Sequence, residues 1–316
     1  MNVVTTCKIR RDIREHLVSA YPEISFQFCE DITEAEPFIH EAEVLLTYGE
    51  DLHDSHIDKA SKLKWIMVLS AGLDEMPFHK IEEKGIIVSN VKGIHSIPMA
   101  EYAISMLLQV SRQAKTVSEN ERLRRWDKKV RMTEITGKTM LIAGAGAIGQ
   151  EVARLAKAFR MKTIGISNSG REKDFFDEVH TRSDLMTKLA EADFVISVLP
   201  STPETKGFFA KEHFEQMPSD AVFLNMGRGD AVHDHVMLEV MQEQLISHAI
   251  LDVFEQEPLP EAHPFWGMYN VTVTPHISGV SPDYQPRGIE IFEHNLKEYR
   301  NGTNDYLNKI NPRKGY

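Results

Sequence analysis

Short apolar runs alternate with longer amphipathic segments along almost the whole chain. Runs of this kind are typical of strands buried on both faces of a parallel sheet, and the segments between them are typical of connecting helices. In the first third, helical patterns such as Asp12–Tyr21 and Ile57–Leu63 separate the predicted strands. Those strands are Val3–Cys7, Ile24–Phe28, Val44–Tyr48, Trp65–Ser70 and Ile86–Ser89. The pattern predicts a first stack of βα units.

A second series of strands begins at Thr139. It continues at Thr163–Ser167, Phe194–Leu199, Ala221–Asn225, Ala249–Val253 and Val271–Thr274. Between the two series, Met99–Ser118 reads as one long helix that leads from the first domain to the second, and a last helix near Gly288–Tyr299 leads back. We therefore expect an α/β protein with two doubly wound parallel-sheet domains, at 1–98 plus 286–316 and at 99–285.

Composition narrows the class of protein. The 316 residues are 42% hydrophobic and 26% charged, which is typical of a globular chain, and the net charge is −11. Such an acidic balance argues against nucleic acid or an anionic membrane surface as a partner. Two cysteines without metal-type spacing give no disulfide framework, and neither a signal peptide nor a membrane-spanning stretch is evident. We expect a cytoplasmic location.

The most informative motif is Gly144-x-Gly146-x-x-Gly149, which follows a predicted strand directly and leads into a helical pattern. This order is that of a dinucleotide site: the first glycine allows a tight turn, the second lets the backbone approach a pyrophosphate, and the third permits close helix–strand packing. The helix N-terminus, with Ala147 and Ile148, then offers N–H groups to the phosphates. The motif predicts a Rossmann dinucleotide-binding domain.

Further motifs give the chain a resemblance to a known family, the NAD(P)-dependent D-isomer-specific 2-hydroxyacid dehydrogenases, which include glyoxylate/hydroxypyruvate reductases and phosphoglycerate dehydrogenases. The matching motifs lie at 144–149, 199–205, 225–232, 251–258 and 274–279, with further landmarks at 70–74 and 100–102. The resemblance covers nearly the whole chain. It implies that the first domain, 1–98 plus 286–316, is flavodoxin-like and binds the substrate, and that the protein is a homodimer formed through the region of the long helix.

The family's catalytic Arg, Glu and His correspond to Arg228, Glu257 and His276. These residue types suit the reduction of a 2-keto acid, which needs a hydride and a proton. A histidine can give the proton near neutral pH, and a neighbouring carboxylate would orient the ring. An arginine can bind a carboxylate or polarise the carbonyl with a planar set of donors. Glu255 is a nearby alternative, but the family register selects Glu257.

The resemblance also implies contacts with cofactor and substrate. The family's remaining cofactor positions correspond to Leu199, Pro200, Thr205, Met226, Gly227 and Asp252. Backbone N–H groups of the loop after the fourth strand would bind the substrate carboxylate, as the family's matching loop does, beside Arg228 and His276. A tyrosine that ends the preceding predicted strand is expected, from its position, to line the same site. These residues are Ser70, Ala71, Gly72, Leu73 and Tyr48.

One segment departs from the family's NAD pattern. An acidic residue about 20 positions beyond the glycines usually binds the adenosine ribose. Here that place holds Ser167, Asn168, Ser169 and Arg171, with no acid among them. Hydroxyl groups and a guanidinium suit a 2′-phosphate, which an Asp would repel. We expect NADP(H) to be preferred, with NAD(H) possible.

The leading function is reduction of glyoxylate, hydroxypyruvate or a related 2-keto acid. A 3-phosphoglycerate dehydrogenase is an alternative, although the loop 68–74 offers no basic group for a phosphate. A second alternative is a dinucleotide-sensing protein similar to the C-terminal-binding corepressors, which retain the catalytic residues. A formate dehydrogenase is disfavoured because that family has Gln at the position of Glu257. The His-x-His pair at 233 and 235 is poor support for a metal, and we expect no metal site.

Overall fold

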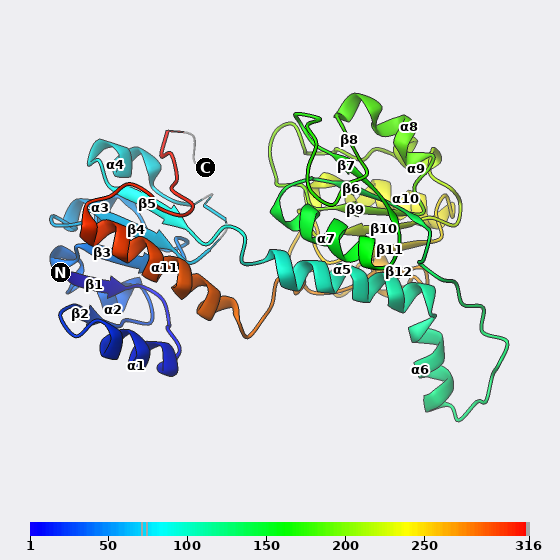
Figure 1. The fold of residues 1–316 in the computed structure, drawn as a ribbon. Helices are drawn as coiled ribbons and strands as arrows, with labels where there is room; N and C mark the ends of the chain where they lie inside the picture. The colour runs from blue at the N-terminus through cyan, green and yellow to red at the C-terminus, as the bar shows by residue number, and fades with distance from the viewer. Residues whose placement is uncertain (71, 74, 314–316) are drawn as a thin grey trace. The chain divides into compact units, whose positions relative to one another are not determined.

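The computed structural model describes residues 1–70, 72–73 and 75–313. The chain divides into two compact units, Met1–Ile94 with Ser281–Tyr316 (unit 1) and His95–Val280 (unit 2). Unit 1 is therefore built from both ends of the chain (Figure 1). The divisions fall at 94/95 and 280/281, where the sequence pattern suggested 98/99 and 285/286. The difference arises because the first turns of the two linking helices lack apolar periodicity.

Unit 1 contains a five-stranded parallel sheet with the strand order β2-β1-β3-β4-β5 among the described residues. This is the flavodoxin-like order, and both faces carry helices. The strands are β1 (Asn2–Thr5), β2 (Ser25–Gln27), β3 (Val44–Thr47), β4 (Trp65–Val68) and β5 (Ile87–Asn90). The helices are α1 (Arg11–Ala20), α2 (Ile32–Ala35), α3 (Asp54–Lys59), α4 (Phe78–Glu83) and α11 (Tyr284–Asn301), with a 3₁₀ turn η1 (Ile39–Glu41).

The returning helix α11 is part of the core of unit 1. Trp65 of β4 is fully buried and stacks on Phe292 of α11 with ring centroids 5.4 Å apart. The indole N–H of Trp65 donates to Ser89 Oγ at 2.9 Å, so the one polar atom of the ring is satisfied. The C-terminal segment therefore completes the fold formed by the first third of the chain.

Unit 2 contains a seven-stranded parallel sheet with the order β12-β11-β10-β9-β6-β7-β8 in the described part of the chain. This is the Rossmann order. Strands are added to one side of β6 up to β8, and then to its other side from β9 to β12, so the order reverses between β6 and β9. The expectation of two doubly wound sheets is confirmed. The strands are β6 (Thr139–Ala143), β7 (Lys162–Ile166), β8 (Glu178–His180), β9 (Phe194–Ser197), β10 (Val222–Asn225), β11 (His248–Leu251) and β12 (Val271–Val273). The sequence pattern did not predict β8.

Helices cover both faces of this sheet, because alternate strand residues point to opposite sides. Met140 and Ile142 pack in a cluster with residues of α5 (Ser96–Ser111) and α7 (Ala147–Ala158). Leu141 and Ala143 face the other helical layer. That layer contains α8 (Leu185–Leu189), α9 (Lys211–Glu215) and α10 (Asp234–Gln242), with 3₁₀ turns η2 (Arg182–Asp184), η3 (Gly229–Ala231) and η4 (Pro264–Gly267).

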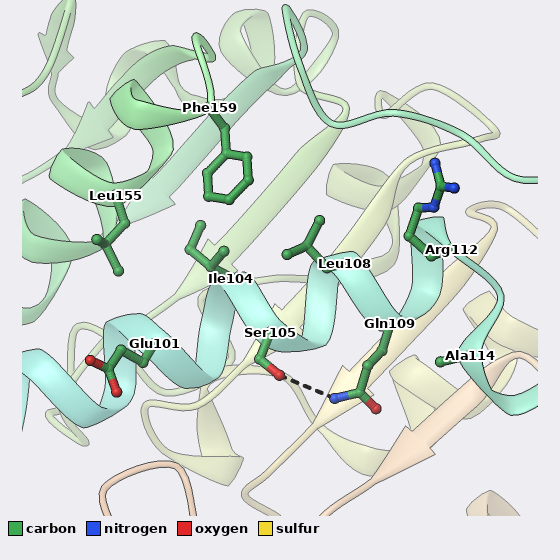
Figure 2. Close-up of a pocket in the computed structure, with 9 residues that line it drawn as sticks. All are labelled: Glu101, Ile104, Ser105, Leu108, Gln109, Arg112, Ala114, Leu155 and Phe159. Carbon is green, nitrogen blue, oxygen red and sulfur yellow. Dashed lines mark hydrogen bonds between the residues drawn. The ribbon is translucent and has the colours of Figure 1, made fainter. Parts of the chain in front are cut away.

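The prediction of one long helix at Met99–Ser118 is wrong, because two helices, α5 and α6 (Ala114–Arg122), occupy this region. The break is at Gln113, whose backbone is left-handed with φ 54°. α5 packs against α7, and Figure 2 shows Ile104 and Leu108 of α5 facing Leu155 and Phe159. α6 buries no residue and, with the segment after it, extends away from the sheet of unit 2 (Figure 1).

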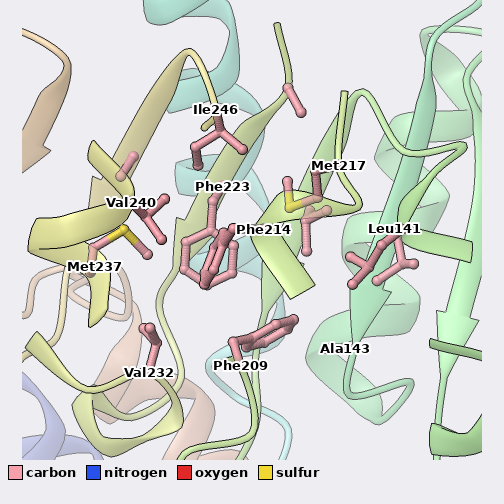
Figure 3. Close-up of a cluster of buried hydrophobic side chains, with 14 of the residues drawn as sticks. Leu141, Ala143, Phe209, Phe214, Met217, Phe223, Val232, Met237, Val240 and Ile246 are labelled. Atoms are coloured by element: carbon pink, nitrogen blue, oxygen red, sulfur yellow. The ribbon is translucent and has the colours of Figure 1, made fainter. Parts of the chain in front are cut away.

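Aromatic rings fill the core between the seven-stranded sheet and α9 and α10 (Figure 3). Phe223 of β10 makes edge contacts with Phe209 and Phe214 at centroid distances of 5.1 Å, and all three are fully buried. Such rings bury large apolar areas and hold the strands rigidly beneath the loops that follow them. Among the described residues, no helix combines the length and the apolar character needed to cross a bilayer.

Candidate active site

The glycine loop links β6 to α7 and has the shape of a phosphate cradle. Gly144 has a φ of 108°, and a Cβ on it would lie 2.9 Å from the carbonyl oxygen of Val198. A Cβ on Gly149 would lie 2.2 Å from the carbonyl oxygen of Gly144, so only glycine fits the helix–strand contact. Gly146 faces open space, and α7 begins at Ala147 with no side-chain cap. Its first N–H groups therefore suit a dinucleotide pyrophosphate.

The segments after β9 and β10, which are also predicted to bind the cofactor, meet beside this loop. A Cβ on Gly227 would lie 2.6 Å from the backbone nitrogen of Leu199, so the segments after β9 and β10 touch through their backbones. Thr205 Oγ1 donates to the Pro200 carbonyl at 2.5 Å and accepts from the Thr202 N–H at 2.8 Å. These bonds fix the loop after β9, next to the point where the sheet reverses.

The segment after β7 lies at the position expected for recognition of the adenosine ribose. Ser167 Oγ accepts from the N–H of Gly170 at 3.2 Å, and Ser169 Oγ accepts from the N–H of Arg171 at 3.4 Å. The side chains of Asn168, Ser169 and Arg171 are exposed. The turn therefore offers hydroxyl, amide and guanidinium groups from an internally bonded backbone.

His276 and Glu257 form a hydrogen-bonded pair at the edge of unit 2. The distance between His276 Nδ1 and Glu257 Oε2 is 2.7 Å, and Glu257 Oε1 accepts from the N–H of Phe254 at 3.0 Å. Because a carboxylate oxygen accepts, Nδ1 carries the proton and Nε2 is the ring atom left for a substrate. Half of the His276 side chain is exposed. The pair has the geometry of a histidine acid oriented by a carboxylate.

Glu255, the alternative carboxylate, is engaged elsewhere. Its Oε1 lies 2.7 Å from His233 Nδ1, and its Oε2 accepts from the N–H of Asp234 in the first turn of α10 at 2.8 Å. A carboxylate at a helix N-terminus is stabilised by the helix dipole and the free N–H groups. The two glutamates of this loop therefore face different partners, and Glu257 is the one that faces His276.

The backbone of His276 is held in an unusual conformation. Its φ is 53°, a region that non-glycine residues rarely adopt, and its N–H donates to the carbonyl oxygen of Asp252 at 2.9 Å. The carboxylate of Asp252 is fully buried and accepts from the N–H groups of Ile277 and Ser278, each at 2.9 Å. Asp252, predicted to contact the cofactor, thus bonds the loop that carries His276.

Arg228 follows β10 at the same sheet edge. It is exposed, and its Nη1 donates to the carbonyl of Gly227 at 2.8 Å. Within the described residues it has no carboxylate partner in an ion pair, so its charge remains available to an anion. The sequence pattern missed His95, which is a neighbour of this group. A Cβ on Gly279 would lie 2.9 Å from His95 Cδ2, and burial together with the charge of Arg228 lowers the pKa of His95.

The residues predicted to bind substrate from unit 1 lie at the carboxyl edge of the five-stranded sheet. Tyr48 follows β3, and its hydroxyl accepts from Gln285 Nε2 at 3.2 Å. Burial raises the pKa of Tyr48. Ser70 follows β4, and its Oγ accepts from the N–H of Gly72 at 3.2 Å, while Leu73 is buried. Ala71 lies outside the described residues.

Comparisons with known proteins place this arrangement in a family. A family model described as D-isomer specific 2-hydroxyacid dehydrogenase, NAD binding domain, matches residues 104–278. A glyoxylate/hydroxypyruvate reductase B of Escherichia fergusonii is 32% identical over 254 residues, which cover 78% of each chain. The chain belongs to the D-isomer-specific 2-hydroxyacid dehydrogenase family. As an NAD(P)-dependent D-2-hydroxyacid dehydrogenase, it carries the glycine loop, Arg228, Glu257 and His276 within the matched NAD-binding domain.

Other relatives of this dehydrogenase differ in length and in the names they carry. A D-3-phosphoglycerate dehydrogenase of Methanocaldococcus jannaschii is 32% identical over 84% of this chain, but the match spans only 51% of that enzyme. A family member from Aeromonas salmonicida has a similar structure, with a TM-score of 0.87, 32% identity, and coverage of 98% of this chain and 99% of that one. An NADPH-dependent glyoxylate/hydroxypyruvate reductase from Sinorhizobium meliloti, solved with NADP and sulfate, has a TM-score of 0.80 and 25% identity, covering 100% of this chain and 99% of that one.

No group of three or more His, Cys, Asp or Glu side chains is arranged to hold a metal ion in the part of the dehydrogenase that the structure describes.

Proposed function

We propose that this dehydrogenase reduces a small 2-keto acid, such as glyoxylate or hydroxypyruvate, to the D-2-hydroxy acid, with NADP(H) preferred and NAD(H) possible. The observation that carries the proposal is the pairing of His276 with Glu257 at 2.7 Å, at the same sheet edge as the glycine loop. An acid with its orienting carboxylate and a dinucleotide cradle are the two components that keto-acid reduction requires.

The proposed roles follow from the contacts. NADPH, when bound, supplies the hydride. His276 Nε2 donates the proton to the carbonyl oxygen of the substrate, while Glu257 holds Nδ1–H and stabilises the charged ring before transfer. Arg228 binds the substrate carboxylate or polarises the carbonyl, because its guanidinium has no carboxylate partner among the described residues. In unit 1, Tyr48 and the loop of Ser70, Gly72 and Leu73 would contribute substrate contacts.

The preference for NADP(H) is supported by the turn after β7. Ser167, Asn168, Ser169 and Arg171 supply donors and a positive charge, and none supplies a carboxylate. A 2′-phosphate is a dianion near neutral pH, so it favours such a turn and is repelled by an acid. The Sinorhizobium meliloti reductase of similar fold is described as NADPH-dependent, which agrees with this proposal.

The test is a steady-state panel of glyoxylate, hydroxypyruvate and a branched 2-keto acid with NADPH and with NADH. We expect turnover with at least one acid and a kcat/KM higher with NADPH. A kcat/KM clearly higher with NADH would contradict the cofactor assignment. Turnover of 3-phosphoglycerate alone would favour the phosphoglycerate dehydrogenase alternative, and tight cofactor binding without any turnover would favour a dinucleotide-sensing role.

We also propose that the protein is a homodimer, formed through α5, α6 and the segment that follows. An open groove of about 590 Å³ lies between α5 and α7, lined largely by apolar side chains such as Ile104, Leu108 and Phe159 (Figure 2). The nearby extension exposes Val117, Leu123, Trp126 and Met132, and Trp126 is 90% exposed. A second copy would bury both surfaces.

Sedimentation velocity tests this dimer. Trp126→Ser should shift the protein toward monomer, whereas Trp266→Ser, at another exposed tryptophan, should leave the distribution unchanged. A wild-type protein that sediments as a monomer at micromolar concentration would contradict the proposal.

A further inference from the structure

The buried carboxylate of Asp252 organises the segment around His276. It follows β11, and its two oxygens accept three hydrogen bonds from that segment: Oδ1 from the Ile277 N–H and from Thr274 Oγ1, and Oδ2 from the Ser278 N–H. The Thr274 contact is the shortest, at 2.6 Å. Asp252 thus binds residues on both sides of His276 in the sequence, and its own carbonyl binds the His276 N–H. The left-handed backbone at His276 is fixed by these bonds.

A fourth group, from a distant part of the sequence, joins this network. The hydroxyl of Tyr102 on α5 lies 2.7 Å from Thr274 Oγ1. Thr274 has one hydroxyl proton, and it is donated to Asp252, so Tyr102 must be the donor to Thr274. Burial raises the pKa of Tyr102 strongly, and the hydroxyl therefore keeps its proton at any working pH. The result is a directed chain from Tyr102 through Thr274 to Asp252.

These hydrogen bonds matter because they support the left-handed backbone of His276, which is energetically unfavourable. A non-glycine residue in the left-handed region is strained and persists only where its surroundings hold it. Thr274 is the last residue before Pro275 and His276, and its hydroxyl is the only side-chain donor to Asp252 among the described residues. Without Tyr102, Thr274 Oγ1 loses its donor, and its orientation toward Asp252 is no longer enforced.

We propose that Tyr102 is a positioning residue for His276, acting through Thr274 and Asp252. This inference rests on the proposed role of His276 as proton donor. It assigns to α5 a function beyond packing, namely to hold the hydroxyl that orders the histidine loop. The simpler view is that Tyr102 only fills space, since its ring packs in the core beside α7. The two views differ in what the hydroxyl does, because phenylalanine fills the same space.

The experiment compares four variants of the full chain with the wild type: Tyr102→Phe, Thr274→Val, Thr274→Ser and the double variant Tyr102→Phe with Thr274→Val. We expect Tyr102→Phe to lower kcat about tenfold while the KM for the keto acid changes less than about twofold, since misplacing a catalytic group costs rate more than binding. Thr274→Val should lower kcat at least as much, and Thr274→Ser, which keeps the hydroxyl, should restore most of it. The solvent deuterium isotope effect on kcat should rise in Tyr102→Phe, because proton donation becomes slower.

The double variant tests whether Tyr102 acts through Thr274. If Tyr102 acts through Thr274, Tyr102→Phe should have no further effect on kcat in the Thr274→Val background. Additive losses would overturn the inference. So would a Tyr102→Phe protein whose kcat per NADPH-binding site equals that of the wild type while His276→Ala is inactive. Retained turnover in His276→Ala is a different result, which would contradict the proposed function itself.

Discussion

The two parallel sheets of this protein have the same architecture but present different chemistry at their carboxyl edges. In unit 2 the segments after the strands carry ionisable groups, with Arg228, Glu257 and His276 all exposed. In unit 1 the groups proposed to bind substrate, Tyr48 and Ser70, are neutral and hydrogen-bond within their own unit.

The supports beneath the two edges differ as well. The loop of His276 is tied by backbone N–H groups to one buried carboxylate, that of Asp252. The groups of unit 1 are held by neutral contacts, such as Gln285 Nε2 to the Tyr48 hydroxyl. A charged acid that must be placed within a fraction of an ångström needs the first kind of support. We infer that unit 2 performs the chemistry and that unit 1 selects the substrate, so substitutions should change kcat in the first and KM in the second.

The largest expected effect is that of His276→Ala. Removing the proton donor should lower kcat by roughly 10²–10⁴-fold, the scale of lost acid–base catalysis, while NADPH binding persists. Stopped-flow measurement of the first turnover would show the loss in the chemical step. The matched control is His294→Ala on α11 of unit 1, which should keep wild-type kcat. Near-normal turnover in His276→Ala would place the chemistry elsewhere.

The second-largest effect is expected for Arg228→Lys. The charge is kept, but the planar pair of donors that fits a carboxylate is lost, and we expect kcat/KM for the keto acid to fall about 10²-fold. The affinity for NADPH, measured by fluorescence quenching, should change little. Arg154→Lys on the exposed face of α7 is the control, since within the described residues the ion pair of Arg154 is with Glu151 of the same helix. An unchanged kcat/KM would remove Arg228 from substrate recognition.

Glu257→Gln and Glu255→Gln form a matched pair on one loop. Glu257 accepts from both the Phe254 N–H and His276, and a glutamine has only one acceptor oxygen for the two donors. We expect Glu257→Gln to lower kcat by about 10- to 100-fold, because the charged ring loses its partner. Glu255 faces His233 and α10, so Glu255→Gln should lower the midpoint temperature of thermal unfolding and leave kcat nearly unchanged. Equal kcat losses in the two variants would show that the loop, and not the Glu257 contact, sets the rate.

How far the sequence predicts the fold depends on burial. β3 and β4 are buried on both faces, and their continuous apolar runs reveal them. β8, with the residues Glu178–His180, is a half-buried edge strand of three residues and has no such run. The break between α5 and α6 is hidden for another reason: apolar positions continue past Gln113, and a single left-handed glutamine has no signature of the kind that glycine gives.

The candidate site is predictable in part for a similar reason. Arg228 and His276 follow predicted strands, and the ends of parallel strands converge on one edge. Spacing alone does not tell which of Glu255 and Glu257 faces His276. That choice depends on the N-terminus of α10, which binds Glu255 from a segment about twenty residues earlier. The link between Tyr102 and Thr274 joins positions 172 residues apart, and no local pattern indicates it.

The smallest expected effect, and the sharpest test of the division between the units, is that of Tyr48→Phe. The ring is kept and the hydroxyl that accepts from Gln285 is lost. The proposed contact of this hydroxyl with the keto acid would be one neutral hydrogen bond, which contributes about 1 kcal/mol, so we expect the KM for the keto acid to rise roughly three- to fivefold with kcat unchanged. Gln285→Leu removes the group that orients this hydroxyl together with the bonds of Gln285 to the Lys8 carbonyl and the Arg10 N–H, so it should raise KM at least as much, and Tyr48→Phe should add little in that background. A kcat loss of tenfold or more in Tyr48→Phe would mean that unit 1 takes part in the chemical step, and the contrast between the two sheet edges would no longer hold.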